Sequence, residues 1–279
     1  MPADCADILV SHRIPIQAIW ETEASGFSPL EGFARRTNIS FRRPSRREIT
    51  AALNNLIEPT VVLSINNNYL FPQQVCEKDN LRIVNFHNSL LPRYPGRNIP
   101  TWVIFNGETR HGVTWHLVDT GIDAGNIMCQ KEFDISNRDT ALKVMMRCIS
   151  LGIELFTGHW QGFIDHQYKG SPQQHMDDRL YRSTDLPNGG YLDISWDFTT
   201  ISRFLRSMDY GPFKIVPSPK VRLDSKLYIV AKHTISKDTE IAEKGFQMRK
   251  SAGRKGDEVE ISYEEGTIKL ELREEDSND

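Results

Sequence analysis

The sequence predicts an α/β protein with a mostly parallel sheet covered by helices on both faces, followed by a smaller, largely β domain. In the first half of the chain, short apolar runs alternate with helical patterns, which is typical of parallel strands joined by crossover helices. Beyond about residue 196 the pattern changes to strand-like runs. A length of 279 residues is enough for two such cores. We therefore expect domains at 1–165 and 196–279, joined by a polar linker over 166–195.

The elements expected in the first domain follow each other in a regular order. Helices are predicted at 3–12, 28–36, 45–56 and 72–77, and strands at 16–20, 38–42, 60–65 and 81–87. The third helix has the clearest start, because Ser45 and Glu48 form a capping box that can satisfy free backbone N–H groups. Two more strands (112–118 and 126–135) flank a glycine-containing turn, and a long amphipathic helix follows at about 139–163. This is a Rossmann-like arrangement.

The second domain is expected to begin with a short helix at 199–208. Strands are predicted within VRLDSKLYIVAKHTI and EVEISYEEGTIKLEL, where apolar and polar residues alternate. The preceding linker is polar and contains Gly and Pro, which disfavour long regular elements.

Composition excludes several functional classes. A net charge of −3 gives no general attraction to nucleic acid or to an anionic membrane. A local exception is RRTNISFRRPSRR (35–47), with six arginines, which is either a solvated edge or a phosphate-facing patch. Four widely spaced cysteines favour reduced thiols and a cytoplasmic location. The sequence contains no run of about 18 apolar residues, so it predicts no membrane span.

Polar side chains gather where the predicted strand 81–87 ends. Asn85 and His87 are two residues apart, so the strand places them on the same face, and a rigid loop with Pro92 and Pro95 follows. In open α/β sheets, ligands bind beyond the carboxyl ends of the strands. Asp123 lies in a later glycine-rich turn. Each feature alone has an ordinary structural explanation.

Several separated motifs in this region give a more specific indication. They are NFHNSLLPRYPGRN (85–98), Trp102, Gly107-Glu108, GVTWH (112–116) and DTGIDAG (119–125). Over about residues 60–135 the chain resembles the folate-dependent formyltransferase family, which includes methionyl-tRNA, glycinamide ribonucleotide and sugar N-formyltransferases. The resemblance implies that Asn85, His87 and Asp123 form the catalytic triad. It also implies N10-formyltetrahydrofolate as the co-substrate, with no metal.

The chemistry of formyl transfer suits these three residue types. When an amine attacks the formyl carbon, the carbonyl oxygen becomes negative, and the amide of Asn85 and a protonated His87 can donate hydrogen bonds to it. Asp123 would favour the charged form of His87 and help move the proton of the amine to N10.

The resemblance also implies where the two substrates bind. The folate would lie against 64–70 and 118–123, with contacts expected from Ser64, Ile65, Asn66, Asn67, Leu70, Val118, Asp119, Gly121 and Ile122. The wall on the acceptor side would consist of Ser89, Leu90, Leu91, Pro92, Arg93 and Tyr94. A plain connecting turn at 64–70 and simple packing of the two leucines are the alternatives.

The acceptor is expected to be a small or carrier-bound primary amine, such as an amino sugar or an amino acid. The segment ISRFLRSMDYGPF (201–213) is similar to the element before the C-terminal domain of the methionyl-tRNA type. Enzymes acting on initiator tRNA carry a basic insertion near 21–32, and this chain has neither lysine nor arginine there. Methionyl-tRNA is therefore the less favoured alternative, since phosphate contacts supply much of such affinity.

A third interpretation is a binding protein rather than an enzyme. Family members begin with a strand before the helix expected at 3–12, and no apolar run precedes that helix in this sequence. A shortened, non-catalytic relative that binds folate or a partner protein is therefore a further alternative. Nothing in the sequence predicts an oligomeric state.

Overall fold

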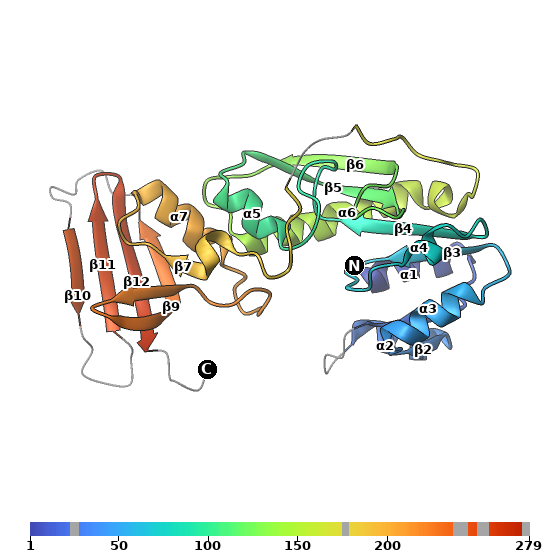
Figure 1. The fold of residues 1–279 in the computed structure, drawn as a ribbon, viewed down its shortest axis with the longest axis horizontal. Coiled ribbons are helices and arrows are strands. Elements are labelled where there is room, and N and C mark those ends of the chain that lie inside the picture. Colours follow the sequence, from blue (N-terminus) through green and yellow to red (C-terminus); the bar gives the residue numbers. More distant parts are fainter. Residues whose placement is uncertain (23–27, 175–178, 237–244, 250–256, 275–279) are drawn as a thin grey trace. The chain divides into compact units, whose positions relative to one another are not determined.

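The computed structural model describes residues 1–22, 28–174, 179–236, 245–249 and 257–274 (Figure 1). Internal contacts divide the chain into two compact units. The first unit comprises Met1–Gly96, Arg110–Phe133 and Met146–Tyr181, and the second unit comprises Arg97–Thr109, Asp134–Met145 and Arg182–Asp279. We retain 1–165, 166–195 and 196–279 as a proposal for the domains and their linker.

The helices and strands predicted for the first half of the chain are present, with ends shifted by a few residues. They are α1 (Pro2–Ser11), β1 (Ala18–Trp20), α2 (Pro29–Thr37), β2 (Ser40–Arg42), α3 (Arg46–Asn54), β3 (Thr60–Ser64), α4 (Gln73–Cys76), β4 (Leu81–His87), β5 (Arg110–Leu117), β6 (Ile127–Asp134) and α6 (Ala141–Ile164). The capping box of α3 is formed, with Ser45 Oγ accepting from the backbone N–H of Glu48 and the Glu48 carboxylate accepting from that of Ser45. The sequence does not predict α5 (Ile99–Phe105), a seven-residue helix.

The central sheet has the order β3-β4-β5-β6 and is mixed rather than wholly parallel (Figure 1). Strands β3 and β4 are parallel, as expected, whereas β4 and β5 are antiparallel. Strands β1 and β2 pair in parallel as a sheet of their own. The antiparallel pair sets the end of β4 directly beside β5, with Asn85 opposite His116.

Helices cover both faces of the sheet. On one face, Trp115 donates its indole N–H to the carbonyl of Gly152 in α6, and its ring packs against Phe156 and Phe163. On the other face, residues of α3 and α4 form a core with β4, made by Ile49, Leu53, Tyr69, Val75, Leu81 and Ile83. Because side chains alternate along a strand, Asn85 and His87 lie on the same face as Ile83. The α3/α4 core therefore ends where the polar residues begin.

A buried arginine joins the sheet to the end of α6. Arg82 donates hydrogen bonds to the carbonyls of Phe163 (2.8 Å), Gly162 (3.3 Å) and Tyr168 (2.6 Å). The last carbonyls of a helix have no partner within the helix, so a cation placed there satisfies them and complements the helix dipole.

The arginine-rich segment 35–47 takes part in ion pairs. Arg43 pairs with both Glu21 and Glu31, and Arg35 pairs with Glu31. Arg46 donates a hydrogen bond to the carbonyl of Asn68. These contacts favour a solvated, charged edge, the first of the two interpretations of this segment.

The second unit is built on one sheet with the order β10-β11-β12-β9-β8-β7. Its elements are α5, η1 (Pro187–Gly190), β7 (Tyr191–Leu192), α7 (Phe198–Ser207), β8 (Lys220–Leu223), β9 (Lys226–Ser236), β10 (Gly245–Arg249), β11 (Asp257–Tyr263) and β12 (Gly266–Glu274). One face of α7 packs on the core of this sheet through Ile201, Phe204 and Leu205. Strand β7 falls within the predicted linker and pairs in parallel with β8.

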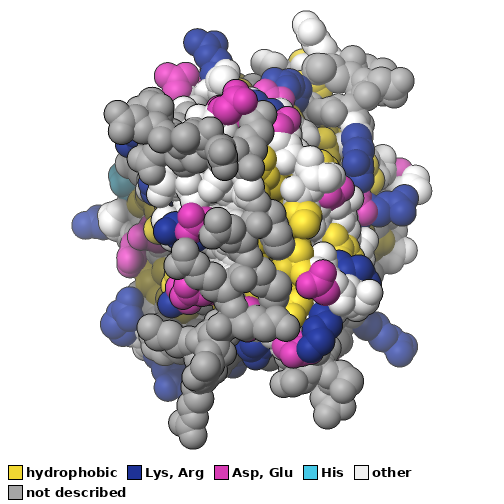
Figure 2. All heavy atoms as spheres, turned by 90° about the vertical axis from the view of Figure 1, so that its left-hand side faces the viewer, with side chains coloured by type: hydrophobic (Ala, Val, Ile, Leu, Met, Phe, Trp, Pro, Cys, Tyr) yellow, Lys and Arg dark blue, Asp and Glu magenta, His cyan; other side chains and the backbone are white. Residues whose placement is uncertain are grey.

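Figure 2 shows the face of the molecule that forms the left-hand side of Figure 1. Lysine and arginine side chains are interspersed there with aspartate and glutamate around smaller hydrophobic patches. On β9, β11 and β12, Lys232 pairs with Glu271 and Lys269 pairs with Glu260. The described residues of this face form no continuous basic surface.

Candidate active site

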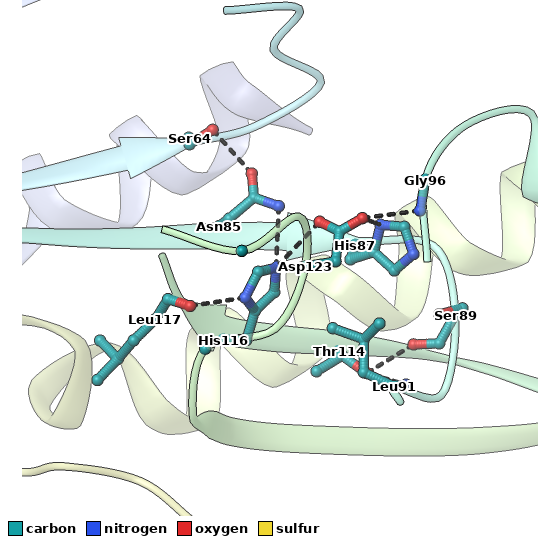
Figure 3. Close-up of polar contacts among 12 residues, drawn as sticks. Ser64, Asn85, His87, Ser89, Leu91, Gly96, Thr114, His116, Leu117 and Asp123 are labelled. Atoms are coloured by element: carbon teal, nitrogen blue, oxygen red, sulfur yellow. Dashed lines mark hydrogen bonds and ion pairs between the residues drawn. The ribbon is translucent and has the colours of Figure 1, made fainter. Parts of the chain in front are cut away.

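Three neighbouring strands set three polar side chains in one row. The register pairs Ser64 of β3 with Asn85 of β4, and Asn85 with His116 of β5 (Figure 3). Ser64 Oγ donates to Asn85 Oδ1 at 2.7 Å, and Asn85 Nδ2 lies 3.1 Å from His116 Nε2. His116 Nδ1 lies 2.7 Å from the carbonyl oxygen of Leu117. Both oxygen and nitrogen of the Asn85 amide are thus engaged.

The carboxylate of Asp123 lies between two imidazoles (Figure 3). Its Oδ2 is 3.5 Å from His87 Nδ1, and its Oδ1 is 3.5 Å from His116 Nε2. Oδ2 also accepts the backbone N–H of Gly96 at 2.8 Å. Burial acts to raise the pKa of Asp123, but its polar contacts, above all the charge of His87, outweigh burial and hold that pKa well below its ordinary value. Asp123 is therefore a carboxylate at neutral pH.

The loop that carries Asp123 is held in place by backbone contacts. Asp123 has a left-handed backbone (φ +52°), a conformation that Asp and Asn adopt more readily than most residues. Gln173 Nε2 donates to the carbonyls of Asp123 and Gly125, both at 2.7 Å. A Cβ at Gly125 would collide with the carbonyl oxygen of Leu117, so only glycine lets the loop approach β5 this closely.

Both ring nitrogens of His87 face oxygen atoms. Nε2 lies 2.9 Å from the carbonyl oxygen of Tyr94, and Nδ1 faces Asp123. Two acceptors around one imidazole suit its doubly protonated form. At 3.5 Å the contact with Asp123 is longer than an ordinary hydrogen bond, so the N–H at Nδ1 can be shared with an incoming oxygen.

The structure brings Asn85, His87 and Asp123 together, although they are far apart along the chain. It also adds groups to which the sequence analysis gave no role: His116, Gln173 and the backbone of Tyr94 and Gly96. His116 stands within the quoted motif GVTWH, but a motif does not show which residue of the neighbouring strand lies opposite. That information is contained in the antiparallel register of β4 and β5.

The two segments expected to contact folate flank this row. Ser64 is buried and donates a hydrogen bond to Asn85. The amide of Asn67 donates to the backbone carbonyl of Tyr69 and accepts from its N–H. By contrast, Leu70 is 71% exposed and Ile122 is 47% exposed. Ile65 and Val118 are half-buried, whereas Asn66, Asp119 and Gly121 are exposed, and the Asp119 carboxylate accepts the N–H of Gly121. Each of the two segments thus carries one exposed apolar side chain.

The six residues expected on the acceptor side divide into two groups. Ser89 and Leu91 are buried, and Ser89 Oγ donates to the carbonyl of Arg93. Tyr94 is also buried, with φ +58°, and its ring stacks on that of Tyr181 at 5.4 Å between centroids. The side chains with surface exposure are those of Leu90, Pro92 and Arg93.

Two further findings concern the described residues as a whole. No three His, Cys, Asp or Glu side chains among them gather in a way that could hold a metal ion. Within the same ranges, no helix is both long and apolar enough to cross a bilayer.

Comparison with known proteins agrees with the motifs. Residues 11–157 match the family model described as formyl transferase. A GDP-perosamine N-formyltransferase from Brucella melitensis is 31% identical over 243 residues, which cover 82% of this chain and 88% of that relative. A methionyl-tRNA formyltransferase from Pelobacter propionicus is 30% identical over 147 residues, which cover 52% of this chain and 46% of that relative.

Solved structures share the fold over nearly the whole chain. An N-formyltransferase from Helicobacter canadensis, in complex with folinic acid and dTDP-3-aminofucose, superposes with a TM-score of 0.73 at 20% identity, covering 97% of this chain and 95% of that one. WlaRD, a sugar 3N-formyltransferase solved with dTDP and 5-N-formyl-THF, gives a TM-score of 0.72 at 21% identity, covering 97% and 93%.

Proposed function

Because the chain belongs to the formyl transferase family, we propose that it moves a formyl group from N10-formyltetrahydrofolate to the primary amine of a nucleotide-linked amino sugar. The observation that carries the choice of acceptor is the match to a GDP-perosamine N-formyltransferase over 88% of that protein's length. The methionyl-tRNA formyltransferase quoted above is matched over only 46% of its length. The net charge of −3 also argues against a polyanionic acceptor such as tRNA.

In the proposed reaction, N10-formyltetrahydrofolate supplies the formyl carbon. A bond forms between the amine nitrogen and this carbon, and the bond from the carbon to N10 breaks. One proton moves from the amine to N10. Asn85 donates an amide N–H and His87 donates from Nδ1 to the oxygen that becomes negative in between. These donors lie at the rigid end of β4, so little reorganisation is needed when the charge develops.

Asp123 has two tasks in this proposal. Its negative charge, 3.5 Å from His87, favours the imidazolium form that can donate to the oxyanion. The same carboxylate is placed to accept a proton from the amine, directly or through a water molecule, and to pass it on to N10. Its lowered pKa keeps it ready as a base but makes it a weak one.

The folate would bind between the exposed apolar side chains of Leu70 and Ile122, with the backbone of 64–70 and 118–123 available for hydrogen bonds to a pterin ring. The acceptor would lie along 89–94, where Leu90, Pro92 and Arg93 have exposed surface. A guanidinium such as that of Arg93 suits a sugar nucleotide, because it can pair with diphosphate oxygens.

The proposal is tested by incubating the purified chain with N10-formyltetrahydrofolate and a panel of amines. The panel contains GDP- and dTDP-linked amino sugars, free amino sugars and charged initiator tRNA, and the product is detected by its added formyl mass. We expect turnover with one or more nucleotide-linked amino sugars and none with tRNA. Formylation of tRNA alone would overturn the choice of acceptor, and no formylation of any amine would overturn the proposed reaction.

A further inference from the structure

The orientation of the Asn85 amide depends on its two neighbours in the sheet. Ser64 Oγ donates to Asn85 Oδ1 at 2.7 Å, so the amide oxygen points toward β3. The amide nitrogen therefore points toward β5, where His116 Nε2 lies at 3.1 Å. Asn85 is half-buried, whereas Ser64 and His116 are 5% and 1% exposed. Figure 3 shows the Asn85 amide between these two side chains. Two buried side chains, Ser64 and His116, thus hold the amide of Asn85, which is itself only half-buried.

The hydrogen bonds also define the form of the His116 ring. The carbonyl oxygen of Leu117, 2.7 Å from Nδ1, can only accept, so Nδ1 carries a proton. The amide nitrogen of Asn85 can only donate, so Nε2 must accept and carries none. With the Asn85 amide in this orientation, the two contacts fit a ring that is protonated at Nδ1 and unprotonated at Nε2.

We propose that His116 is a positioning residue for formyl transfer: its Nδ1–H form takes up one N–H of Asn85 and leaves the other N–H directed at the formyl oxygen. This inference rests on the proposed function. It assigns a task to a side chain outside the triad of Asn85, His87 and Asp123. Without an acceptor at this position, the amide is free to turn, and an oxygen facing the developing oxyanion would repel it.

The neighbouring carboxylate makes the protonation state of His116 decisive. Asp123 Oδ1 lies 3.5 Å from the same Nε2, and the ring of His87 lies 6.4 Å away between centroids. A proton at Nε2 would be donated to Asp123, and Asn85 would then face a donor instead of an acceptor. The amide would turn its oxygen to His116, and the N–H reserved for the substrate would change direction.

The kinetic test compares two substitutions at this position. In His116→Leu the acceptor is lost, and we expect kcat to fall by about a hundredfold while both KM values stay within about threefold. In His116→Gln a side-chain oxygen can accept from Asn85, so we expect about ten times more activity than in His116→Leu. Equal kcat values in the two variants, or near wild-type kcat in His116→Leu, would overturn the proposal.

A second measurement needs no turnover. In the ¹⁵N spectrum of histidine-labelled wild-type protein at pH 8, the His116 signal, identified by its absence from His116→Gln, should show a protonated Nδ1 and an unprotonated Nε2. The opposite tautomer, or a doubly protonated ring, would overturn the inference. If no amine is formylated but this tautomer is observed, the proposed reaction fails while the arrangement of Asn85 and His116 stands.

Discussion

At the scale of single residues, the charge of Asp123 is the central feature of the site. Asp123 faces His87 and His116 with opposite oxygens, each at 3.5 Å, and takes a third contact from the backbone N–H of Gly96. The charge of His87 and the backbone N–H of Gly96 favour the carboxylate over the acid, against the effect of burial. The negative charge of Asp123 is therefore the property that favours a charged His87 ring beside it.

Replacing Asp123 with Asn isolates this charge. Asn has nearly the same size, tolerates the left-handed backbone (φ +52°) and can still accept from Gly96. We expect turnover to fall by about 10²- to 10⁴-fold, with a melting temperature within about 4 °C of the wild type. Asp193→Asn, at an exposed turn residue of the second unit, is the matched control and should keep full activity. Near wild-type turnover in Asp123→Asn would refute the role given to the charge.

A second titratable residue bears on stability rather than on chemistry. His111 is 3% exposed, and burial lowers its pKa from 6.5 to about 3. Between these values the unfolded chain binds a proton that the folded chain does not. The stability contributed by the neutral ring is therefore complete above about pH 6.5 and is lost as the pH falls, by about 1.4 kcal/mol per pH unit.

His111→Phe should remove this part of the acid sensitivity, since the new ring can keep the contact with Phe133. Both proteins are compared by the free energy of unfolding that they lose between pH 7 and pH 5. We expect this loss to be about 2 kcal/mol smaller in His111→Phe than in the wild type. Urea titrations at the two pH values measure the difference. If the variant loses as much stability as the wild type between the two pH values, His111 is not the group that causes this acid sensitivity.

The sequence predicts a triad of Asn85, His87 and Asp123, whereas no pattern in it points to a role for His116. The triad follows from motifs, and the spacing of Asn85 and His87 on one strand follows from strand periodicity. The partner of Asn85 depends on how β4 and β5 are aligned, which is a contact between segments about thirty residues apart. No local pattern contains this information. The predicted folate and acceptor contacts remain predictions.

At the scale of elements, the loop between β5 and β6 decides whether Asp123 reaches the imidazoles. Gly125 lies so close to the carbonyl of Leu117 that any Cβ would push the loop away from β5. Gln173, from a distant segment, ties the same loop down through two carbonyls. The position of the carboxylate is thus fixed from both sides.

Gly125→Ala tests this arrangement. The loop must move to accept the methyl group, and a displacement of about 1 Å can cost about a hundredfold in rate, so we expect kcat to fall at least tenfold. Gly158→Ala is the control, because a Cβ there meets nothing within 4 Å and the residue is in the middle of α6. It should keep full activity and gain up to about 1 kcal/mol in stability. Equal activity in both variants would contradict the role of Gly125.

Elements with a local signal were predicted well. Helix α3 has its capping box, and β4 is an apolar run of the expected length. Helix α5 was missed because it has only seven residues and contains Pro100, although proline is well tolerated in the first turn. Strand β10 was missed as well, and its pairing with β11 is again a matter of register. Strand–helix alternation predicts a mostly parallel sheet, and it does not indicate that β5 runs antiparallel to β4.

For the molecule as a whole, charge separates the two classes of acceptor. The chain carries 34 basic and 37 acidic residues, and Arg35 and Arg43 of the arginine-rich segment form ion pairs with glutamates. A protein that contacts six to ten phosphates of a nucleic acid loses about 10³ to 10⁵ in affinity between 50 and 200 mM salt. A sugar nucleotide offers only two phosphates.

We therefore expect kcat/KM for a nucleotide-linked amino sugar to change by less than about tenfold over this range of salt. Initiator tRNA should not inhibit the reaction at low micromolar concentration. The measurement is a set of initial rates at 50 and 200 mM salt, with and without tRNA. Inhibition by tRNA that weakens steeply with salt would revive the nucleic-acid acceptor.

The row of Ser64, Asn85 and His116 across three strands has a consequence for how relatives of this protein can diverge. Its geometry is inherited from the ladder of main-chain hydrogen bonds, whereas 89–94 and 118–123 are connecting segments outside that ladder. Insertions and substitutions in such segments can alter which amine is admitted without disturbing the reacting centre. A shift of one residue in the pairing of β4 with β5, by contrast, would turn His116 to the opposite side and leave the amide without its anchor. Selectivity for the amine can therefore change among relatives, whereas the reacting centre depends on the register of the strands.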